Sequence, residues 1–344
     1  ISGEADDITA VQNAGSFSHD GDDYTVTIAD ADGNLTVTEI NAIAGLTGGV
    51  VTAVAISTDI ADYDGTNATL TTLSTDKIAI TINNTPVDAA KLVVLDNKTA
   101  TTINATAVED FSGAADEVAA IVSSDGVSLD TDFTSTVTNE DGKSYVDAAD
   151  IVTIDNAGNG TVTATSITEM QGTADNIVTA ATSGHVTIDG DMLFNVTSGE
   201  ADVTQINTLD ALTSGIITAI ISENDAATLI TLDNDNGNNA LTIELTDSDV
   251  LASNLATIAS STSVAVNGTA IGTIEGSLDN VKSVFNSGGV TLTVSGDTAV
   301  DADITNSTVV AADVKIVDTA TAGSVNINTA TSITGTAADI ATVM

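Results

Sequence analysis

The chain has 344 residues with 49 acidic and 6 basic side chains, which gives a formal net charge of −43. Nucleic acids and anionic membranes are bound through clustered positive charge, so this balance argues against both as partners. Cysteine is absent, which excludes disulfides and thiolate metal sites, and no apolar run is long enough for membrane insertion.

Composition leaves two states open, a disordered chain and a folded one. High net charge and 2% aromatic residues are typical of disorder. In contrast, 42% hydrophobic residues with periodic Ile, Val and Leu favour a folded chain. We expect a folded protein whose acidic surface suits salty or calcium-containing surroundings, where counter-ions screen its self-repulsion.

The chain is built from internal repeats, which decide the fold and are therefore examined first. One pattern recurs without gaps at 87–118, 146–177, 250–281 and 309–340. Every copy starts with valine, and two aliphatic columns three residues apart follow, for example Leu92 and Leu95. A glycine closes each copy, at Gly113, Gly172, Gly276 and Gly335.

A longer duplication contains these copies. Residues 37–54 match 203–220, and residues 87–118 match 250–281. The sequence therefore predicts two solenoid superrepeats, 1–169 and 170–332, and the start of a third at 333–344. Residues 1–8 (ISGEADDI) match residues 333–340 (ITGTAADI), as expected for a segment of a longer array.

A smaller unit of about 28 residues lies inside the superrepeats, as in other repeat proteins. Its first half predicts a short helix, because an aliphatic pair at i and i+3 follows a capping Thr, Ser or Asp. In the last such helix, 336–344, we expect Ala337, Ile340 and Val343 to face inward. The marker residues that begin the aliphatic pairs are Ile8, Ile40, Leu70, Leu92, Val118, Ile151, Ile177, Ile206, Leu229, Leu255, Val281, Val314 and Ile340.

The second half of each unit predicts a strand. Apolar residues alternate with polar ones at Val127/Leu129, Val186/Ile188, Val290/Leu292 and Val325/Ile327. Such a unit buries its apolar face only by stacking, which predicts a repeat solenoid of parallel β-strands with short helices or helical turns. A β-solenoid without helices and tandem all-β sandwich domains are the alternatives, although a sandwich needs about 100 residues and the repeat is far shorter.

Three acidic segments are candidate calcium sites, because calcium prefers oxygen ligands. The segment 30–39 (DADGNLTVTE) fits part of a calcium loop with Asp30, Asp32, Asn34 and Glu39, but Ile28 stands at the first ligand position. The segments 59–67 and 233–237 offer Asp59, Asp62, Asp64, Asn67, Asp233 and Asp235. The competing interpretation is that Asp-Gly and Asn-Gly form turns on a solvated edge.

Catalytic patterns do not stand out. The two histidines, His19 and His185, have no serine or carboxylate partner at a recognisable spacing, so we expect surface positions for both. Acidic pairs are too frequent here to indicate acid–base chemistry, and no phosphate-binding glycine loop or nucleophile elbow occurs. The sequence predicts no enzyme and no catalytic residue.

The phrases ITGTAADI, MQGTADNI and VDAADIVTID resemble the Ala/Asp/Thr-rich tandem repeats of giant secreted surface proteins of marine bacteria, including cyanobacteria. This resemblance implies a secreted or cell-surface, bacterial location and a structural or adhesive role, often with calcium.

The leading hypothesis is a self-associating structural segment of a surface layer (S-layer), filament or adhesin, stabilised by calcium. The alternatives are a carbohydrate- or ice-binding solenoid with a flat Thr-rich face, with glycans as partners, and a carboxylate-based polysaccharide-active enzyme. Regular outward Thr-x-Thr ladders would support the second hypothesis; residues 161–163 supply one step, which the other three copies do not repeat.

Overall fold

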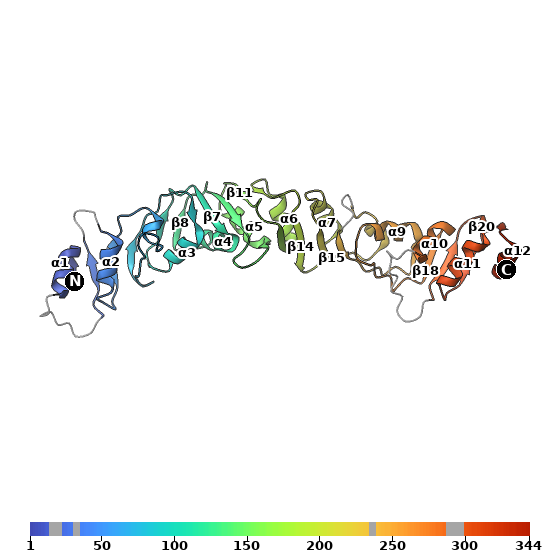
Figure 1. Ribbon diagram of the computed structural model, residues 1–344, viewed down its shortest axis with the longest axis horizontal. Coiled ribbons are helices and arrows are strands. Elements are labelled where there is room, and N and C mark those ends of the chain that lie inside the picture. Colours follow the sequence, from blue (N-terminus) through green and yellow to red (C-terminus); the bar gives the residue numbers. More distant parts are fainter. Residues whose placement is uncertain (14–22, 30–34, 234–238, 287–298) are drawn as a thin grey trace. The chain divides into compact units, whose positions relative to one another are not determined.

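The structure, a computed structural model, describes residues 1–13, 23–29, 35–233, 239–286 and 299–344 (Figure 1). The chain divides into two compact units, of which unit 1 comprises Ile1–Thr168 with Thr179–Asp189, and unit 2 comprises Glu169–Val178 with Gly190–Met344. Each unit is described by itself, and helix α6 (Ala174–Thr182) falls across the division.

Unit 1 is an α/β unit with short elements in regular succession. Its helices are α1 (Ala5–Asn13), α2 (Val37–Ala44), the 3-10 turn η1 (Ile60–Asp62), α3 (Ala89–Asp96), α4 (Ala115–Val122) and α5 (Ala148–Ala157). Its strands are β1 (Ser2–Gly3), β2 (Val26–Ile28), β3 (Val51–Val54), β4 (Lys77–Ala79), β5 (Val87–Asp88), β6 (Ile103–Ala105), β7 (Asp110–Ala114), β8 (Val127–Leu129), β9 (Thr134–Thr138), β10 (Val146–Asp147), β11 (Val162–Thr163) and β13 (Val186–Thr187). They form sheets in the orders β1-β2-β3-β4, β13-β11-β9-β7-β5 and β6-β8.

Unit 2 repeats this organisation. Its helices are α7 (Val203–Asp210), α8 (Ala226–Leu229), α9 (Ala252–Ser260), α10 (Leu278–Asn286), α11 (Ala311–Ala320) and α12 (Ala337–Val343). Its strands are β12 (Glu169–Thr173), β14 (Leu193–Ser198), β15 (Ile217–Ile220), β16 (Ala240–Thr242), β17 (Asp249–Leu251), β18 (Thr273–Gly276), β19 (Asp301–Ile304), β20 (Thr308–Val310), β21 (Val325–Asn326) and β22 (Ser332–Thr334). These pair in the orders β12-β14-β15-β16, β17-β18-β19-β21 and β20-β22.

Strand pairing inside both units is parallel, and neighbouring strands belong to successive repeats. In unit 1, Val87 of β5 faces Phe111 of β7, and Phe111 faces Ser135 of β9. In unit 2, Ile274 of β18 lies between Val250 and Ala302 in the same manner. Successive helices also pack together, as α3 does on α4 and α10 on α11 (Figure 1). The alternatives of all-β sandwiches and of a helix-free β-solenoid are therefore wrong.

The aliphatic markers form the core. Twelve of the thirteen lie in helices, and twelve are buried. Leu70 is buried but lies in a loop, where the prediction of a helix is wrong: its segment forms η1 ten residues earlier, and Leu70 N donates to the Tyr63 carbonyl. Ile340 is half-buried, and Ala337 beside it is exposed, against expectation. The reason is that α12 packs on α11 with one face, while its other face is uncovered in the described residues.

The expected order of helix then strand is incomplete. Val127–Leu129, Val186–Thr187 and Val325–Asn326 are strands, although Ile188 and Ile327 lie just past their ends, and Val290/Leu292 lies outside the described residues. A further strand comes directly before many helices, as β7 does before α4. The sequence hides it because the repeat glycine stands near its end. Gly113 has φ +150°, and a Cβ there would lie 3.6 Å from the Ala89 Cβ of the preceding helix.

Buried threonine hydroxyls join several of the short repeats, which we call coils, to the coil before. We call these residues the clasp threonines: Thr47, Thr99, Thr213, Thr262 and Thr321. The Oγ1 of Thr213, for example, donates to the Met192 carbonyl at 2.6 Å and accepts from Gly215 N at 2.8 Å. The other four donate in the same way to a carbonyl 21 or 23 residues earlier and accept from the backbone N–H two residues later. The hydroxyl thus completes the hydrogen bonding of a buried turn, whose polar groups would otherwise be unsatisfied.

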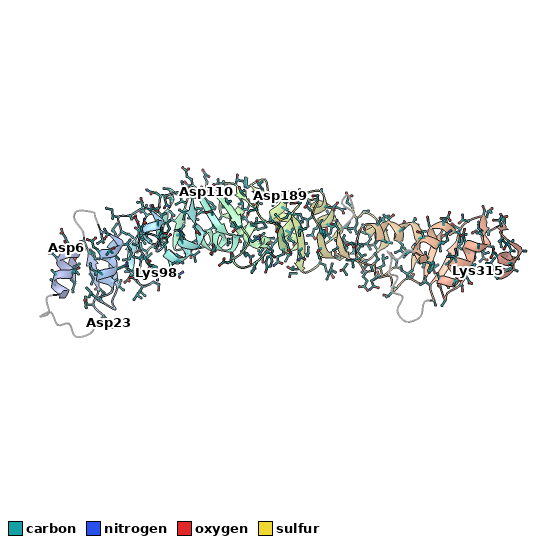
Figure 2. The ribbon with its side chains drawn as sticks, viewed as in Figure 1. Asp6, Asp23, Lys98, Asp110, Asp189 and Lys315 are labelled. Atoms are coloured by element: carbon teal, nitrogen blue, oxygen red, sulfur yellow. The ribbon has the colours of Figure 1, made fainter. Side chains whose placement is uncertain are left out.

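Acidic side chains occupy the outside of both units. The labelled carboxylates Asp6, Asp23, Asp110 and Asp189 lie along the outer edge of the ribbon (Figure 2). Within the residues described, no helix is both long and apolar enough to span a membrane.

Candidate functional site

The loop 57–67 of unit 1 brings together four of the predicted metal ligands, and most of their polar contacts lie inside the loop. Asp59 Oδ1 accepts from Ala61 N at 3.0 Å and caps η1. Asp62 accepts from the Ser57 hydroxyl and from Asn67 Nδ2. Asp64 accepts from Thr66 N and pairs with Lys91 Nζ at 2.6 Å. The loop is thus held by its own hydrogen bonds and one ion pair.

The carboxylates of this loop are stabilised in their charged form. Hydrogen bonds from Ser57 and Asn67 lower the pKa of Asp62, against burial and the charge of Asp64. Burial raises the pKa of Asp64, but the hydrogen bonds from Lys91 and Thr66 outweigh it, so that the net direction is downward. These shifts follow from donors in the protein, which compete with a metal ion for the same oxygens.

The remaining predicted ligands are separated. Glu39 belongs to the capping box of α2, where its carboxylate accepts from Thr36 N at 2.8 Å. Asp233 is exposed, and its backbone N–H donates to Asn207 Oδ1. Asp30, Asp32, Asn34 and Asp235 lie outside the described residues. Within the described ranges, no three His, Asp or Glu side chains are grouped so that they could hold a metal ion.

The face of the sheet β13-β11-β9-β7-β5 carries an ordered row of hydroxyls. Ser112, Thr136, Thr163 and Thr187 stand opposite one another on adjacent parallel strands, and we call them the hydroxyl row. Phe111, Ser135 and Val162, which directly precede the first three members of the row, are buried, whereas Thr136 and Thr187 are exposed, so the row points outward. Adjacent strands lie about 4.8 Å apart, which sets the spacing of the row.

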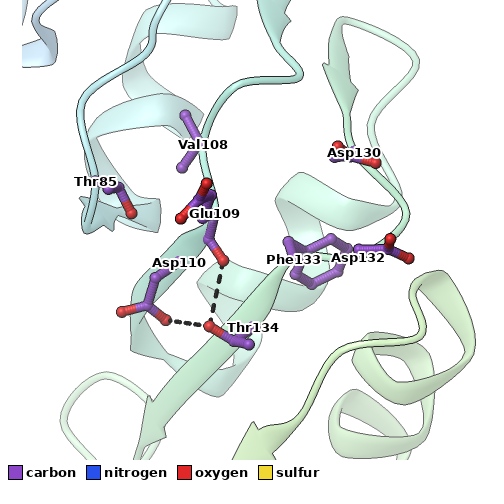
Figure 3. Close-up of a pocket in the computed structure, with 8 residues that line it drawn as sticks. All are labelled: Thr85, Val108, Glu109, Asp110, Asp130, Asp132, Phe133 and Thr134. Atoms are coloured by element: carbon purple, nitrogen blue, oxygen red, sulfur yellow. Dashed lines mark hydrogen bonds between the residues drawn. The ribbon is translucent and has the colours of Figure 1, made fainter.

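A pocket of about 480 Å³ opens beside this row (Figure 3). Its floor includes Phe133, which is 3% exposed and packs edge-on against Phe111 with ring centres 5.4 Å apart. Thr134 Oγ1 lies 3.0 Å from Asp110 Oδ1 and 3.2 Å from the Glu109 carbonyl oxygen (Figure 3). The complete lining is Thr85, Val108, Glu109, Asp110, Asp130, Asp132, Phe133 and Thr134.

This lining determines which kinds of ligand the pocket can bind. Its four carboxylates accept hydrogen bonds and attract cations, and its two threonines add hydroxyl groups. No basic side chain lines it. The pocket therefore suits a ligand rich in hydroxyl or ammonium groups and disfavours an anionic one.

Unit 2 contains a second acidic pocket of about 420 Å³ at the start of α7. Asp202 and Gln205 form the capping box of that helix, and Gln205 Nε2 donates to Asp175 Oδ1 at 2.6 Å. Glu200, Ser198 and Ser222 complete much of the polar lining. Its polar groups serve mainly to begin a helix, so we rank the face of unit 1 as the better candidate site.

His185 is a surface residue, as predicted, with a side chain 55% exposed. Its Nδ1 lies 3.7 Å from Asp155 Oδ1, and Ser183 Oγ donates to Asp155 Oδ2 at 2.9 Å. The carboxylate, not the imidazole, stands between the other two groups, so this arrangement lacks the serine–histidine contact of a nucleophilic triad. His19 lies outside the described residues.

Sequence reasoning missed the hydroxyl row for an identifiable reason. It compared equivalent positions of the long repeat, such as 163 with 326, whereas the strand next to β11 comes from the adjacent coil. The usable signal is Thr134-x-Thr136-x-Thr138 followed one coil later by Thr161-x-Thr163.

Comparison with known protein families, curated proteins and solved structures finds no match to this chain.

Proposed function

We propose that this chain is a structural repeat segment of an extracellular surface-layer, filament or adhesin protein, and that its coils form a solenoid. The observation that supports this most is that both units join successive coils by the same contacts. The clasp threonines occur in both units, as does a bridging asparagine. Asn41 and Asn207, which are equivalent in the duplication, each donate to a carbonyl and accept from an N–H of the following coil.

Such contacts suit a protein whose role is length and cohesion. A coil offers its neighbour a strand edge and a helix face, and at the clasp threonines a buried hydroxyl, so stability accumulates from nearest-neighbour interfaces. The same kinds of contact, strand edge against strand edge and helix face against helix face, can form between two molecules. We propose that this supports self-association.

The proposal includes calcium because the chain carries a large negative charge. A formal charge of −43 with only six lysines makes self-repulsion large, and divalent cations reduce it most effectively at clustered surface carboxylates. Ligand binding to the native state alone raises its stability by mass action.

The test is thermal unfolding and static light scattering of the purified chain with calcium, with magnesium, and with sodium chloride at matched ionic strength. We expect calcium to raise the melting temperature above both controls and to increase the scattering mass. Negative-stain microscopy then shows whether assemblies form. Particles that stay monomeric and respond equally to all three salts would refute calcium-stabilised self-association.

The hydroxyl row favours a second candidate function, a carbohydrate- or ice-binding face. Outward hydroxyls at a fixed spacing match a ligand with repeating hydroxyl groups, and the acidic pocket beside the row adds acceptors for it. A glycan array and a thermal-hysteresis assay test this directly. Thr136→Leu, in the middle of the row, should abolish binding, whereas Thr218→Leu on the exposed face of β15 in unit 2 should not.

A further inference from the structure

The internal duplication lets one unit serve as a control for the other. Helices α4 and α5 of unit 1 correspond to α10 and α11 of unit 2 at an offset of 163 residues. In unit 2, Lys282 Nζ lies 2.9 Å from Asp313 Oδ1 and 3.5 Å from Asp279 Oδ1. One ammonium group therefore joins a carboxylate of α10 to a carboxylate of α11.

Unit 1 keeps the two carboxylates but lacks the ammonium. Asp116 and Asp150 stand at the positions of Asp279 and Asp313, and Ala119 replaces Lys282. Ala119 is 6% exposed, so its methyl group is packed between the helices. The Oδ1 atom of Asp116 is buried and has no hydrogen-bond partner. A buried acceptor without a donor is costly, and it marks a place where a proton or cation would be stabilised.

Other charges around Asp150 and Glu117 in unit 1 add to the negative potential. The turn before β10 contributes Glu140, Asp141 and Lys143, the start of α5 contributes Asp147, the start of α4 contributes Asp116 and Glu117, and the N-cap of α3 is Asp88. Lys143, the basic residue of this group, already pairs with Glu140, which is 4% exposed and also accepts from Asp147 N. Its charge is thus committed to another carboxylate.

The titration behaviour agrees with this arrangement. Burial, with the charges of Glu140, Asp147 and Asp116, raises the pKa of Asp150 to about 6, and Lys143 opposes the shift only in part. Burial also raises the pKa of Glu117; the hydrogen bond from Ala114 N opposes this, and Asp141, Asp88 and Asp116 add to it.

We propose that unit 1 takes up a proton between Asp116 and Asp150 in mild acid, at the place where unit 2 holds the ammonium of Lys282, and that this proton strengthens the packing of α4 on α5. The proton comes from hydronium, which leaves as water. The proton neutralises one of the two carboxylates, so that repulsion between like charges on α4 and α5 is removed.

The direction of the pH effect follows from linkage. The folded state binds this proton more tightly than the unfolded state, whose Asp has an ordinary pKa of 3.8. The contribution to stability is therefore complete below about pH 4 and is lost as the pH rises through about 6. Unit 1 becomes more stable in mild acid through this contact, while the Lys282 contact of unit 2 keeps its ammonium over the same range.

Reciprocal substitutions test the proposal, with thermal unfolding of the whole chain between pH 4.5 and 7.5. Ala119→Lys should raise the melting temperature of unit 1 at pH 7.5 by about 2–4 °C and give a smaller gain at pH 4.5. Lys282→Ala should lower it for unit 2, more at pH 7.5 than at pH 4.5. Ala120→Lys on the exposed side of α4 and Lys315→Ala on α11 change the overall charge equally and serve as matched controls.

A second variant does not depend on fitting a lysine. Asp150→Asn carries no charge at any pH and donates a hydrogen bond, so it should raise the melting temperature at pH 7.5 and flatten its pH dependence. Equal effects of Ala119→Lys and Ala120→Lys at every pH would overturn the proposal, as would a destabilised Asp150→Asn at pH 7.5. A gain from 2 mM calcium at pH 7.5 that Ala119→Lys removes would also overturn it, since a metal ion and not a proton would then occupy the position.

Discussion

At the residue scale, small polar side chains at buried turns decide how well one coil is joined to the next. Thr213 is 5% exposed, and its hydroxyl both donates to the Met192 carbonyl and accepts from Gly215 N. Valine has the same shape but provides neither interaction. A clasp threonine therefore contributes through its hydrogen bonds, because valine would pack equally well in its place.

Thr213→Val should lower the free energy of unfolding by about 1–3 kcal/mol, because two buried backbone groups lose their partner. Urea unfolding followed by circular dichroism measures this. Thr218→Val, on the exposed face of β15 in the same unit, should stay within about 0.5 kcal/mol of wild type. Equal effects of the two substitutions would mean that the clasp hydroxyl contributes nothing specific.

The two units stabilise the same buried turn with different polar groups. In unit 1, Asp76 is 2% exposed and accepts from Val51 N and Leu73 N. In unit 2, the equivalent Asn239 accepts from Ile217 N and donates to Asp210. The equivalent of Asp210 in unit 1 is Ala44, so Asp76 has no acceptor beside it and must itself accept twice.

Asp76→Asn should cost about 1–3 kcal/mol, because its amide group would meet the N–H of Leu73, donor against donor. Adding Ala44→Asp supplies the acceptor that unit 2 has, and should recover part of the loss. Chemical denaturation of the two single variants and the double variant gives the coupling energy. If the changes in the free energy of unfolding were strictly additive, an acceptor at position 44 would not compensate for the amide at position 76.

At the element scale, the short helices depend on their caps, because helices of 8 to 10 residues are unstable alone. Helix α2 begins with a capping box in which Thr36 accepts from Glu39 N, while Glu39 accepts from Thr36 N. These hydrogen bonds lower the pKa of Glu39. Their contribution is therefore present above the ordinary carboxyl pKa and is lost as the pH falls through the lowered value.

Thr36→Ala should destabilise unit 1 by about 0.5–2 kcal/mol at pH 7 and by less in acid below the lowered pKa of Glu39, where this carboxylate is protonated. A carboxyl-detected NMR titration should show the pKa of Glu39 moving back toward its ordinary value. Thr38→Ala, on the exposed side of the same helix, is the control. A loss that is the same at both pH values would contradict the role of the carboxylate.

The repeat glycines allow a strand to run directly into a helix. Gly276 at the end of β18 has φ +158°, and a Cβ there would lie 3.2 Å from the Ala252 Cβ of the preceding helix. Ordinary L-residues rarely adopt this conformation. Glycine therefore recurs at this position for two reasons: the backbone has a positive φ angle, and the preceding helix approaches too closely for a side chain.

Gly276→Ala should destabilise unit 2 by more than about 1 kcal/mol, since both the backbone angle and the neighbouring methyl group oppose the new side chain. Gly272→Ala is the matched control, because its Cβ would meet only the Ser248 carbonyl oxygen at 3.4 Å. Thermal unfolding compares the two. If Gly272→Ala proved the more harmful, the strand–helix junction would not be the sensitive point.

At the scale of the whole molecule, repulsion between like charges opposes folding. The formal charge is −43, and the three lysines that form ion pairs in the described residues are Lys91, Lys143 and Lys282. Exposed carboxylates repel one another over about 10 Å at 0.1 M salt. Stability therefore depends on the solvent more than it would in a protein of balanced charge.

Raising sodium chloride from about 0.01 to 0.5 M should increase the melting temperature of both units, because the screening length falls from about 30 Å to only a few ångströms. The gain should shrink at pH 4.5, where part of the carboxylates are protonated. Differential scanning calorimetry over this salt series measures it. A melting temperature that falls with salt would show that attractive ion pairs, few as they are, outweigh the repulsion.

Periodic patterning determined the elements of this chain. Twelve of thirteen aliphatic markers lie in helices because an i, i+3 pair after a capping residue has few other ways to bury itself. Leu70 is the exception: its segment has the apolar residue, but loop hydrogen bonds that the carboxylates of Asp59, Asp62 and Asp64 accept hold the chain in a different form.

The acidic segments show the opposite outcome. From sequence, Asp59, Asp62, Asp64 and Asn67 are four candidate oxygen ligands, because spacing alone does not say where each carboxylate points. In the structure the oxygens of the three aspartates meet Ala61 N, Ser57, Thr66 N and Lys91, and the last of these comes from helix α3 in the next coil. Only the tertiary structure could decide this, since the partner lies 27 residues away.

The sequence by itself determined that this is an α/β repeat chain with parallel pairing, because its apolar periodicity survives every substitution between copies. Only the tertiary structure decided which residues became neighbours across coils. The hydroxyl row, the clasp threonines and the placement of Asp116 on α4 near Asp150 on α5 all depend on the register between adjacent coils. That register is set by packing and by the hydrogen-bonded turns, and no local pattern of residues encodes it.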